Sequence, residues 1–244
     1  MTTDKKNNNH ALIIGGSSGV GNKLAVKLSK QGAVSVLARR NDRLRDLESK
    51  SENIYSCSSD VTSYETLFES IKNCVQNHGK INKLIYCAGK QIIKPHRLLN
   101  EDDITSLIEV NLRGALYASK IFLSSKISEK NAVFCAISSI ASIKPEPGIV
   151  AYSAMKASLD ALIKGLARES APRRFVGVAP GWLDTEMTQN QIVYNESFKS
   201  DLKNRSPLGL TELSDIIDAI EYIISDKAAS VTGQILTIDS GSSL

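Results

Sequence analysis

The sequence predicts a single-domain α/β fold in which helices cover both faces of a doubly wound parallel sheet of seven strands. Short apolar runs alternate with amphipathic helical segments from residue 10 to residue 244. The apolar runs are continuous, which is typical of strands buried on both faces of a parallel sheet. The chain has 244 residues and is 42% hydrophobic, enough for one sizeable core, and no linker or internal repeat divides it.

The first strand–helix unit follows a polar tail. This tail, MTTDKKNNN at residues 1–9, is expected to be disordered. The apolar run HALIIGG at 10–16 is closed by glycines and predicts the first strand. In 20–32 the apolar residues recur with a helical period, and Gly32 stands where helices commonly end.

The alternation continues through the first half of the chain. AVSVLA at 33–38 and NIYSCSS at 53–59 predict strands, and a polar helix at 41–50 separates them. Residues 62–78 predict the next helix, which Gly79 ends. A strand–helix–strand rhythm of this kind places helices on both sides of the sheet.

The second half of the chain contains longer elements. Continuous apolar runs predict strands at 82–89, 132–138 and 174–180. A helix of unusual length fills 101–127, and another occupies 151–170.

The C-terminal part is less regular. Residues 186–206 form a polar segment that we expect to cover the substrate. A helix at 211–225 and a last strand at 234–239 complete the predicted sheet. Ligands of such sheets bind beyond the carboxyl ends of the strands, so the residues directly after each strand are the candidates for function.

Composition argues against several classes of function. The net charge is +4, the basic residues are scattered and aromatic residues make up 5%, so we expect no nucleic-acid partner. The apolar run ALII is too short for a signal peptide or a membrane span, which favours a cytoplasmic protein without membrane contact. No CxxC or metal-ligand spacing occurs, so we expect reduced thiols and no metal. The residues concerned are Cys57, Cys74, Cys87, Cys135, His10, His78 and His96.

A glycine-rich turn, GGSSGVG, follows the first strand. Its glycines are spaced GxxxGxG at the start of a helix. Glycines allow a tight turn and a close approach to a pyrophosphate, and free N–H groups at a helix N-terminus favour an anion. A plain strand-to-helix turn is the alternative, but the place in the first strand–helix unit favours a dinucleotide cofactor. The candidate residues are Gly15, Ser17, Ser18, Gly19, Val20 and Gly21.

Cations follow the second strand. NAD sites usually carry a carboxylate here, whereas this chain has Arg39 and Arg40 and no acid before Asp42. Guanidinium groups suit the 2′-phosphate of NADP, with Arg39 as the first partner and Arg40 and the hydroxyl of Ser17 or Ser18 as second partners. An exposed basic pair at a helix start is the alternative. The pair therefore favours NADP(H) over NAD. After the third strand, Asp60 either accepts from the adenine amino group or caps the next helix, with Val61 beside it.

Small or polar residues follow the central strand. Cys87, Ala88 and Gly89 would let the chain pass close to a ribose. Further on, Asn111 lies inside an apolar helical stretch, where asparagine is a poor helix former. Asn111 is either a satisfied core group or a local break in the helix that holds water.

The stretch AYSAMK carries a candidate proton-transfer pair. Tyr152 and Lys156 lie one helical turn apart, which is either a solvated helix face or a phenol beside an ammonium that lowers its pKa. Ser139 follows the fifth strand directly, where a serine is usually part of a turn. Because Ser139 precedes Tyr152 by about one loop, all three side chains could face one cleft.

In this order and spacing, the motifs resemble those of the short-chain dehydrogenase/reductase family. The glycine turn, the strand-end Asp60, YCAG, VN with Asn111, SS, YxxxK and PG…T occur in sequence over residues 10–244. SPLGLTELSDI, SDKAASVTGQILTIDSG and APGWLDTEMT are similar to segments of 3-oxoacyl-[acyl-carrier-protein] reductases. The resemblance implies a Rossmann-type fold.

The resemblance also implies roles for individual residues. Ser139 would place the substrate oxygen, and Tyr152 would act as acid and base. Lys156 would bond the nicotinamide ribose, and Asn111 would hold the water that refills the proton. A phenol of lowered pKa protonates a carbonyl oxygen as the cofactor's hydride reaches carbon. Further cofactor contacts are implied for Pro180, Gly181, Leu183 and Thr185.

The chain departs from the family pattern in places. Tyr86 and Cys87 replace the asparagines of the family motif NNAG, so a contact that braces the sheet is in doubt. Ile14 replaces the usual threonine before Gly15, and the connection into the sixth strand is slightly short. These departures weaken the subfamily assignment more than the chemistry.

The implied function is an NADPH-dependent oxidoreductase that transfers hydride to a ketone, with a 3-oxoacyl thioester as the first candidate substrate. One alternative is a dehydrogenase of a sugar, a polyol or another secondary alcohol. A second alternative, from a different class, is an NADP(H)-binding sensor without turnover.

Two kinds of partner are expected. The helices at 101–127 and 151–170 carry more apolar positions than one sheet face requires, which predicts a homo-oligomer, a dimer or a tetramer. These positions are Ile108, Leu112, Leu116, Leu159, Leu162 and Leu166. An acyl carrier protein would dock near the cleft through basic residues, and scattered solubilising charge is the alternative. The basic residues are Lys126, Lys130, Arg173 and Arg174.

Overall fold

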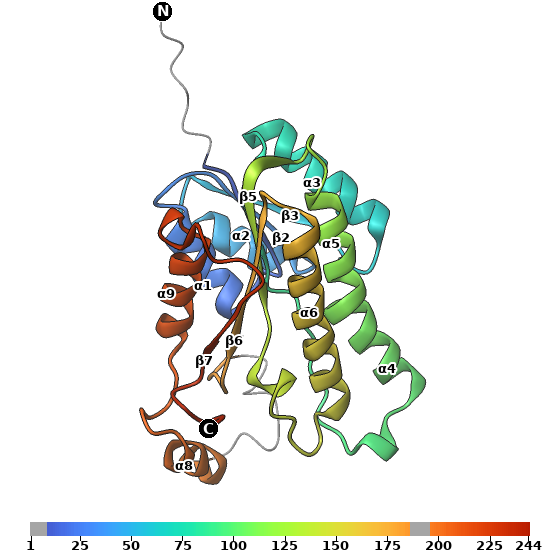
Figure 1. The fold of residues 1–244 in the computed structure, drawn as a ribbon. Coiled ribbons are helices and arrows are strands. Elements are labelled where there is room, and N and C mark those ends of the chain that lie inside the picture. Colours follow the sequence, from blue (N-terminus) through green and yellow to red (C-terminus); the bar gives the residue numbers. More distant parts are fainter. Residues whose placement is uncertain (1–8, 186–195) are drawn as a thin grey trace, which may run out of the picture.

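The predicted sheet is present. The computed structural model describes residues 9–185 and 196–244, and in it seven parallel strands follow the order β3-β2-β1-β4-β5-β6-β7 (Figure 1). Most of the tail predicted at 1–9 therefore lies outside the described residues. The strands are β1 (Ala11–Ile14), β2 (Val34–Ala38), β3 (Ile54–Ser58), β4 (Ile81–Tyr86), β5 (Ser128–Ile137), β6 (Arg174–Pro180) and β7 (Ile235–Ile238).

Helices cover both faces of this sheet (Figure 1). On one face lie α1 (Gly19–Leu28), α2 (Asn41–Glu48) and α9 (Leu213–Ile224), and on the other lie α3 (Tyr64–His78), α5 (Gly114–Phe122) and α6 (Val150–Glu169). Successive side chains of a strand point to opposite faces. In β1, Ile13 joins the first apolar cluster while Leu12 and Ile14 join the second, and all three are fully buried. This two-sided burial explains why the strands are continuous apolar runs.

The long helix predicted at 101–127 is wrong in its extent. α4 (Glu101–Ile108) continues through a π-helical turn (Glu109–Arg113) into α5, which ends at Phe122. β5 already begins at Ser128. The prediction missed this start because the first residues of the strand, SEKN, are polar. Ser128 is buried and donates a hydrogen bond to the carbonyl of Phe122 over 2.6 Å, which closes the connection.

A helix also lies within the segment predicted to be irregular. α8 (Glu196–Arg205) occupies the second half of 186–206, while residues 186–195 lie outside the described residues. Short 3-10 turns complete the secondary structure at His96–Leu98, Ile140–Ser142 and Asp226–Ala228.

The part of the chain that the structure describes contains neither a membrane-spanning helix nor a cluster of metal ligands. None of its helices combines the length and the apolar character needed to cross a bilayer. No group of three His, Cys, Asp or Glu side chains there is arranged to hold a metal ion.

The strand order reverses between β1 and β4, since the chain builds β2 and β3 on one side of β1 and the later strands on the other. At such a point the loops after neighbouring strands diverge and leave a crevice at the carboxyl edge of the sheet. The loops after β1, β4, β5 and β6 border this crevice, and it is where the candidate residues gather.

Candidate active site

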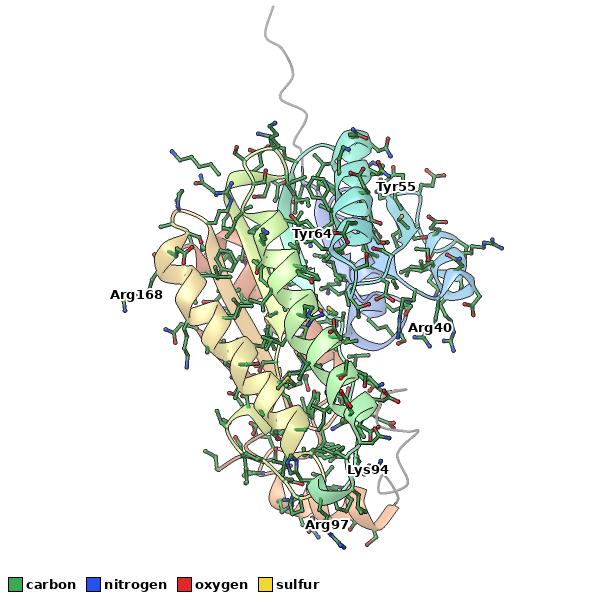
Figure 2. The ribbon with its side chains drawn as sticks, turned by 90° about the vertical axis from the view of Figure 1, so that its right-hand side faces the viewer. Arg40, Tyr55, Tyr64, Lys94, Arg97 and Arg168 are labelled. Carbon is green, nitrogen blue, oxygen red and sulfur yellow. The ribbon has the colours of Figure 1, made fainter. Side chains whose placement is uncertain are left out.

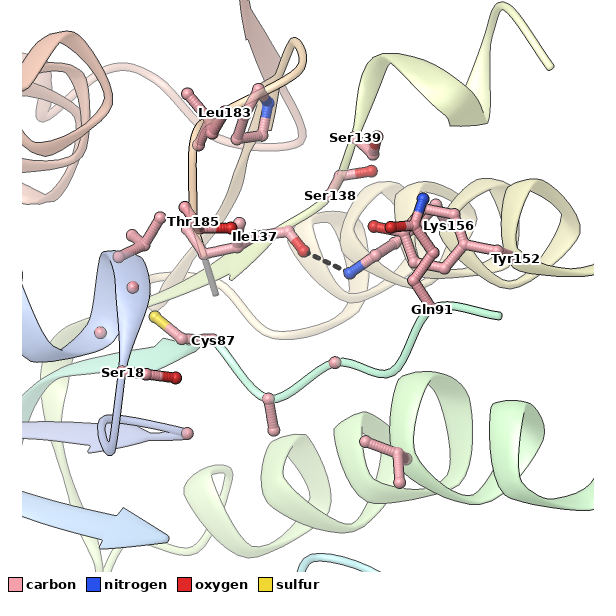
Figure 3. A pocket seen from close by; sticks show the side chains of 18 of the residues that line it. Ser18, Cys87, Gln91, Ile137, Ser138, Ser139, Tyr152, Lys156, Leu183 and Thr185 are labelled. Carbon is pink, nitrogen blue, oxygen red and sulfur yellow. Dashed lines mark hydrogen bonds between the residues drawn. The ribbon is translucent and has the colours of Figure 1, made fainter. Parts of the chain in front are cut away.

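The crevice is a cleft of about 410 Å³ at the carboxyl edge of the sheet (Figure 3). The structure brings every candidate site residue to its lining except Asn111. The lining contains Gly15, Ser17, Ser18, Gly19, Val20, Gly21, Arg39, Arg40, Asp60, Val61, Cys87, Ala88, Gly89, Ser139, Tyr152, Lys156, Pro180, Gly181, Leu183 and Thr185.

Two glycines of the glycine turn, Gly15 and Gly21, leave no room for a side chain. Gly15 has a φ of +93°, and a Cβ there would lie 2.4 Å from the backbone nitrogen of Ala88. A Cβ on Gly21 would lie 2.6 Å from the carbonyl oxygen of Gly15. α1 begins at Gly19, so the unpaired N–H groups of its first turn border the cleft. The turn is therefore shaped for the close approach of an anion to backbone.

Arg40 rather than Arg39 contacts the glycine turn. The Nη2 of Arg40 donates to the Oγ atoms of Ser18 at 2.8 Å and Ser17 at 3.1 Å, and its Nε donates to Ser17 at 3.2 Å. Arg39 is exposed at the cleft edge. The two serine hydroxyls and the Arg40 guanidinium thus form one polar cluster, whereas the sequence suggested Arg39 as the first cation at this place.

Asp60 does not cap the following helix. The N-cap of α3 is Ser63, whose hydroxyl accepts from the backbone N–H of Thr66. Asp60 instead accepts from the backbone N–H and the hydroxyl of Thr62, at 3.0 and 2.9 Å. These two bonds use one carboxylate oxygen and fix the side chain at the cleft wall.

Tyr152 and Lys156 lie on one face of α6, which turns them towards the sheet. The Nζ of Lys156 donates to the carbonyl of Ile137 over 2.8 Å and lies 5.5 Å from the centre of the Tyr152 ring (Figure 3). Ser139 follows β5 and caps the turn Ile140–Ser142 by accepting from the N–H of Ala141. The bond that Lys156 donates to β5 and the cap that Ser139 forms on the following turn help to hold the three groups at one end of the cleft.

Burial dominates the titration of this pair. It raises the pKa of the Tyr152 phenol to about 12, and a hydrogen bond with Ser139 opposes part of this rise. Burial also lowers the pKa of Lys156 to about 8, against the attraction of Asp160 and Cys87. The expected fall in the phenol's pKa is therefore not produced by the chain's own groups, because desolvation outweighs the hydrogen bond with Ser139.

Asn111 is a satisfied core group and not part of the cleft lining. It is fully buried in the π-helical turn. Its Nδ2 donates to the carbonyls of Lys90 at 2.8 Å and Leu107 at 2.9 Å, and its Oδ1 accepts from the N–H of Lys90 at 3.2 Å. Asn111 thus ties the loop after β4 to the helix, and the local break expected at this position is the π-helical turn.

Tyr86 makes a contact of its own at the departure from the family motif. Its hydroxyl donates to the carbonyl of Val110 over 2.6 Å, and the side chain is almost fully buried. A Cβ on Gly114 would lie 2.4 Å from this hydroxyl oxygen, so glycine is required there. The phenol therefore braces the end of β4 against the π-helical turn.

Sequence reasoning missed several residues of the lining. Gln91, Lys144, Glu146, Ile149 and Trp182 were not singled out, although all line the cleft. Gln91 comes directly after the predicted ribose loop, and three of the others lie between Ser139 and Tyr152. Proximity to the recognised motifs was the available signal, because none of these residues belongs to a pattern.

The fold and this cleft define a dinucleotide-dependent oxidoreductase, and the comparisons with known proteins agree. Residues 9–194 match the family model "short chain dehydrogenase", so the chain belongs to the short-chain dehydrogenase/reductase family.

Curated relatives cover almost the whole chain. The 3-oxoacyl-[acyl-carrier-protein] reductase FabG of Haemophilus influenzae is 30% identical over 241 residues, covering 95% of this chain and 96% of its own. Gluconate 5-dehydrogenase of Gluconobacter oxydans is 28% identical over 239 residues, covering 95% and 93%. A short-chain dehydrogenase/reductase structure from Serratia marcescens has a TM-score of 0.89 at 25% identity, covering 97% and 98%. Similar identities to enzymes with different substrates leave the substrate to be argued from the cleft.

Proposed function

We propose that the protein is an NADPH-dependent reductase of a ketone. The observation that carries the proposal is the convergence of Ser139, Tyr152 and Lys156 on the same cleft as the glycine turn. Within an oxidoreductase family, this constellation supports turnover and argues against the alternative of an NADP(H)-binding sensor.

The residues present fit a dinucleotide. Gly15 and Gly21 have no space for a Cβ and Gly19 has a φ of +56°, so the turn has a tight form in which backbone N–H groups can meet a pyrophosphate. The end of β2 offers cations where NAD sites place a carboxylate, and Arg40 with two serine hydroxyls suits a 2′-phosphate. These features support NADPH over NADH.

The chain's own groups would carry out the proton transfer. NADPH would supply the hydride. Ser139 would donate a hydrogen bond to the substrate carbonyl, and Tyr152 would protonate its oxygen. With a pKa raised to about 12, the phenol stays protonated at neutral pH and is ready to donate. In the reverse direction, a phenolate would need the positive charge of the oxidised nicotinamide in addition to that of Lys156.

The first candidate substrate is a 3-oxoacyl thioester, supported by the similarity to 3-oxoacyl-[acyl-carrier-protein] reductases and consistent with a role in fatty acid biosynthesis. A sugar or polyol derivative is the second candidate, because Gln91, Lys144 and Glu146 make part of the lining polar and gluconate 5-dehydrogenase is a relative. The test is NADPH oxidation against acetoacetyl thioesters and keto-sugars. Absence of turnover with every ketone, despite NADPH binding, would favour the sensor.

Docking of an acyl carrier protein would require a basic surface other than the expected one. Arg174 stands at the start of β6, whereas the cleft lies beyond its end at Pro180. The Arg174 guanidinium donates to the carbonyls of Ile223, Val231 and Ser225, and Arg173 donates to Ser128. The surface around these arginines therefore lies at the wrong edge of the sheet. We retain a cytoplasmic location and a homo-oligomer as parts of the proposal.

A further inference from the structure

One part of the cleft lining is charged and has no role in the chemistry proposed above. Lys144 and Glu146 lie on the loop between Ser139 and Tyr152, and Gln91 lies on the loop after β4. All three line the cleft together with the catalytic serine and tyrosine. Because Lys144 and Glu146 lie in the chain between Ser139 and Tyr152, we assign them, with Gln91, to the substrate end of the cleft.

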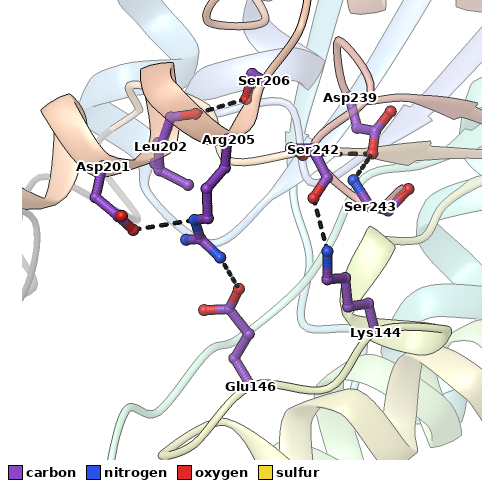
Figure 4. A network of polar contacts seen from close by, with 9 residues as sticks. All are labelled: Lys144, Glu146, Asp201, Leu202, Arg205, Ser206, Asp239, Ser242 and Ser243. Atoms are coloured by element: carbon purple, nitrogen blue, oxygen red, sulfur yellow. Dashed lines mark hydrogen bonds and ion pairs between the residues drawn. The ribbon is translucent and has the colours of Figure 1, made fainter.

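Glu146 already forms an ion pair. Its Oε1 lies 3.3 Å from the Nη1 of Arg205 on α8, and Arg205 also pairs with Asp201 through its Nε at 3.0 Å (Figure 4). Both partners of Arg205 are acids, so Glu146 shares its cation with a second carboxylate.

Lys144 is bound to a neutral group. Its Nζ donates to the carbonyl of Ser242 over 2.9 Å, and its backbone N–H donates to the carbonyl of Ile140 over 2.8 Å (Figure 4). Among the described residues, no carboxylate lies within ion-pair distance of this ammonium. A lysine has three donors, so two remain for a ligand. The ammonium is thus held in place without being neutralised.

The charges that line the cleft also leave Lys144 available to an anionic ligand. Its ionisable cations are Arg39, Arg40, Lys144 and Lys156, and its carboxylates are Asp60 and Glu146. Arg40 lies at the glycine turn, Arg39 is exposed at the cleft edge, and Lys156 is buried beside Tyr152, where the proposed reaction uses it. Lys144 is therefore the positive charge that the described lining offers to the substrate beyond its carbonyl.

We propose that Lys144 and the amide of Gln91 form an anion-binding subsite, and that the substrate is a small ketone carrying a carboxylate. The proposal rests on the function proposed above and chooses within it, because an ammonium in a partly buried cleft disfavours a long apolar acyl chain. A carboxylate would accept charge-assisted bonds from Lys144 and a further bond from Gln91.

The test uses the single tryptophan of the chain, Trp182, which lines the same cleft. Enzyme saturated with NADP⁺ is titrated with 3-oxobutanoate, 4-oxopentanoate and 5-oxohexanoate and with their methyl esters, following Trp182 fluorescence. Oxidised cofactor cannot reduce a ketone, so the titration measures binding alone. We expect at least one acid to bind about 10- to 100-fold more tightly than its ester, the range of one charge-assisted bond.

The Lys144→Met variant should abolish that acid-to-ester preference. Lys130→Met is the matched control, because Lys130 is exposed beside the start of β5 at the opposite edge of the sheet. If Lys144→Met does not fold, the wild type still decides, since the acid preference must weaken between low and high salt. Equal binding of acids and esters at all three lengths would overturn the subsite.

Turnover with NADPH separates this inference from the proposed function. Acid-selective binding without reduction of any ketone would support the subsite and contradict the reductase. Reduction of esters and thioesters with no preference for acids would support the reductase and overturn the subsite.

Discussion

At the scale of single residues, the burial of Tyr152 and Lys156 governs the chemistry proposed for the site. Tyr152 is buried beside Lys156, whose Nζ is committed to the carbonyl of Ile137. The phenol is thus isolated from water except through the cleft, which keeps its proton available to a bound carbonyl. Substitutions that remove one atom or one charge here test chemistry with little effect on the fold.

Tyr152→Phe removes the proposed proton donor while keeping the ring. We expect kcat to fall by roughly 10²- to 10⁴-fold or more, the range of general acid catalysis. NADPH affinity should remain close to that of the wild type, because the hydroxyl faces the substrate. Steady-state kinetics and a titration of NADPH fluorescence measure the two quantities. Near-normal turnover would remove Tyr152 from the mechanism.

Arg40→Ala should reduce the preference for NADPH more than Arg39→Ala does. Arg40 bonds the serine hydroxyls of the glycine turn, whereas Arg39 is exposed at the cleft edge. Loss of one or two charge-assisted bonds to a 2′-phosphate lowers the ratio of kcat/KM for NADPH over NADH about 10- to several-hundred-fold. A wild type that prefers NADH, or equal effects of the two substitutions, would contradict this assignment.

His10 links stability to pH. It is fully buried, its Nδ1 lies 2.8 Å from the carbonyl of Gly79, and its Nε2 lies 2.8 Å from the Oγ of Ser35. Burial lowers its pKa to about 4 from 6.5. The unfolded chain therefore binds the proton more readily, and stability should fall as pH drops from about 6.5 towards 4.

Urea unfolding between pH 7 and pH 5 measures this effect. The wild type should lose roughly 1–2 kcal/mol over this interval through His10, and His10→Gln should lose less because it has no proton to bind. Parallel curves for the two proteins would show that His10 does not contribute.

At the scale of elements, the π-helical turn between α4 and α5 is joined to Tyr86, one of the departures from the family pattern. Asn111 bonds the loop after β4 from inside this turn, and Tyr86 bonds the carbonyl of Val110. Gly114 provides the space for the Tyr86 hydroxyl. Strand, loop and helix are therefore joined by two polar side chains, Tyr86 of β4 and Asn111 of the π-helical turn.

Tyr86→Phe should destabilise the protein by about 1 kcal/mol, the typical value of one hydrogen bond. Gly114→Ala should cost more, because its Cβ would meet the Tyr86 hydroxyl at 2.4 Å. In the double variant the hydroxyl is absent, so the loss of unfolding free energy should be smaller than the sum of the two single-variant losses. Urea unfolding of the four proteins gives the coupling, and strict additivity would contradict the contact.

At the scale of the whole molecule, α4, α5 and α6 form one outer side of the protein (Figure 2), and each carries an exposed apolar residue. Ile104, Leu116 and Val150 are each 40–47% exposed there. Of the positions expected at an interface, Leu159 is fully buried and packs towards the sheet, so it does not belong to this surface. Leu116 is the exposed member of the expected set, and with Ile104 and Val150 it favours a second copy of the chain as the cover.

Leu116→Lys should weaken this association by placing a charge in an apolar interface, while Leu116→Met keeps the side chain apolar and serves as the control. Sedimentation at micromolar concentration should show an oligomer for the wild type and for Leu116→Met. The lysine variant should shift towards monomer. A wild type that sediments as a monomer would contradict the homo-oligomer.

The parallel sheet and the set of residues around its carboxyl edge could be predicted from the sequence alone. Continuous apolar runs require burial on both faces, and the residue after each strand of a parallel sheet must stand at the same edge. The order of the motifs was therefore enough to gather Gly15, Asp60, Ser139 and Tyr152 at one cleft.

The contacts of each side chain at this edge could be read only from the tertiary structure. It turned Asn111 into the core, chose Arg40 over Arg39 at the glycine turn, and put Arg174 at the edge far from the cleft. It also brought Gln91 and Lys144 into the lining. The physical reason is that local periodicity specifies an element and its faces, whereas burial, charge pairing and pKa depend on groups brought together from distant parts of the chain.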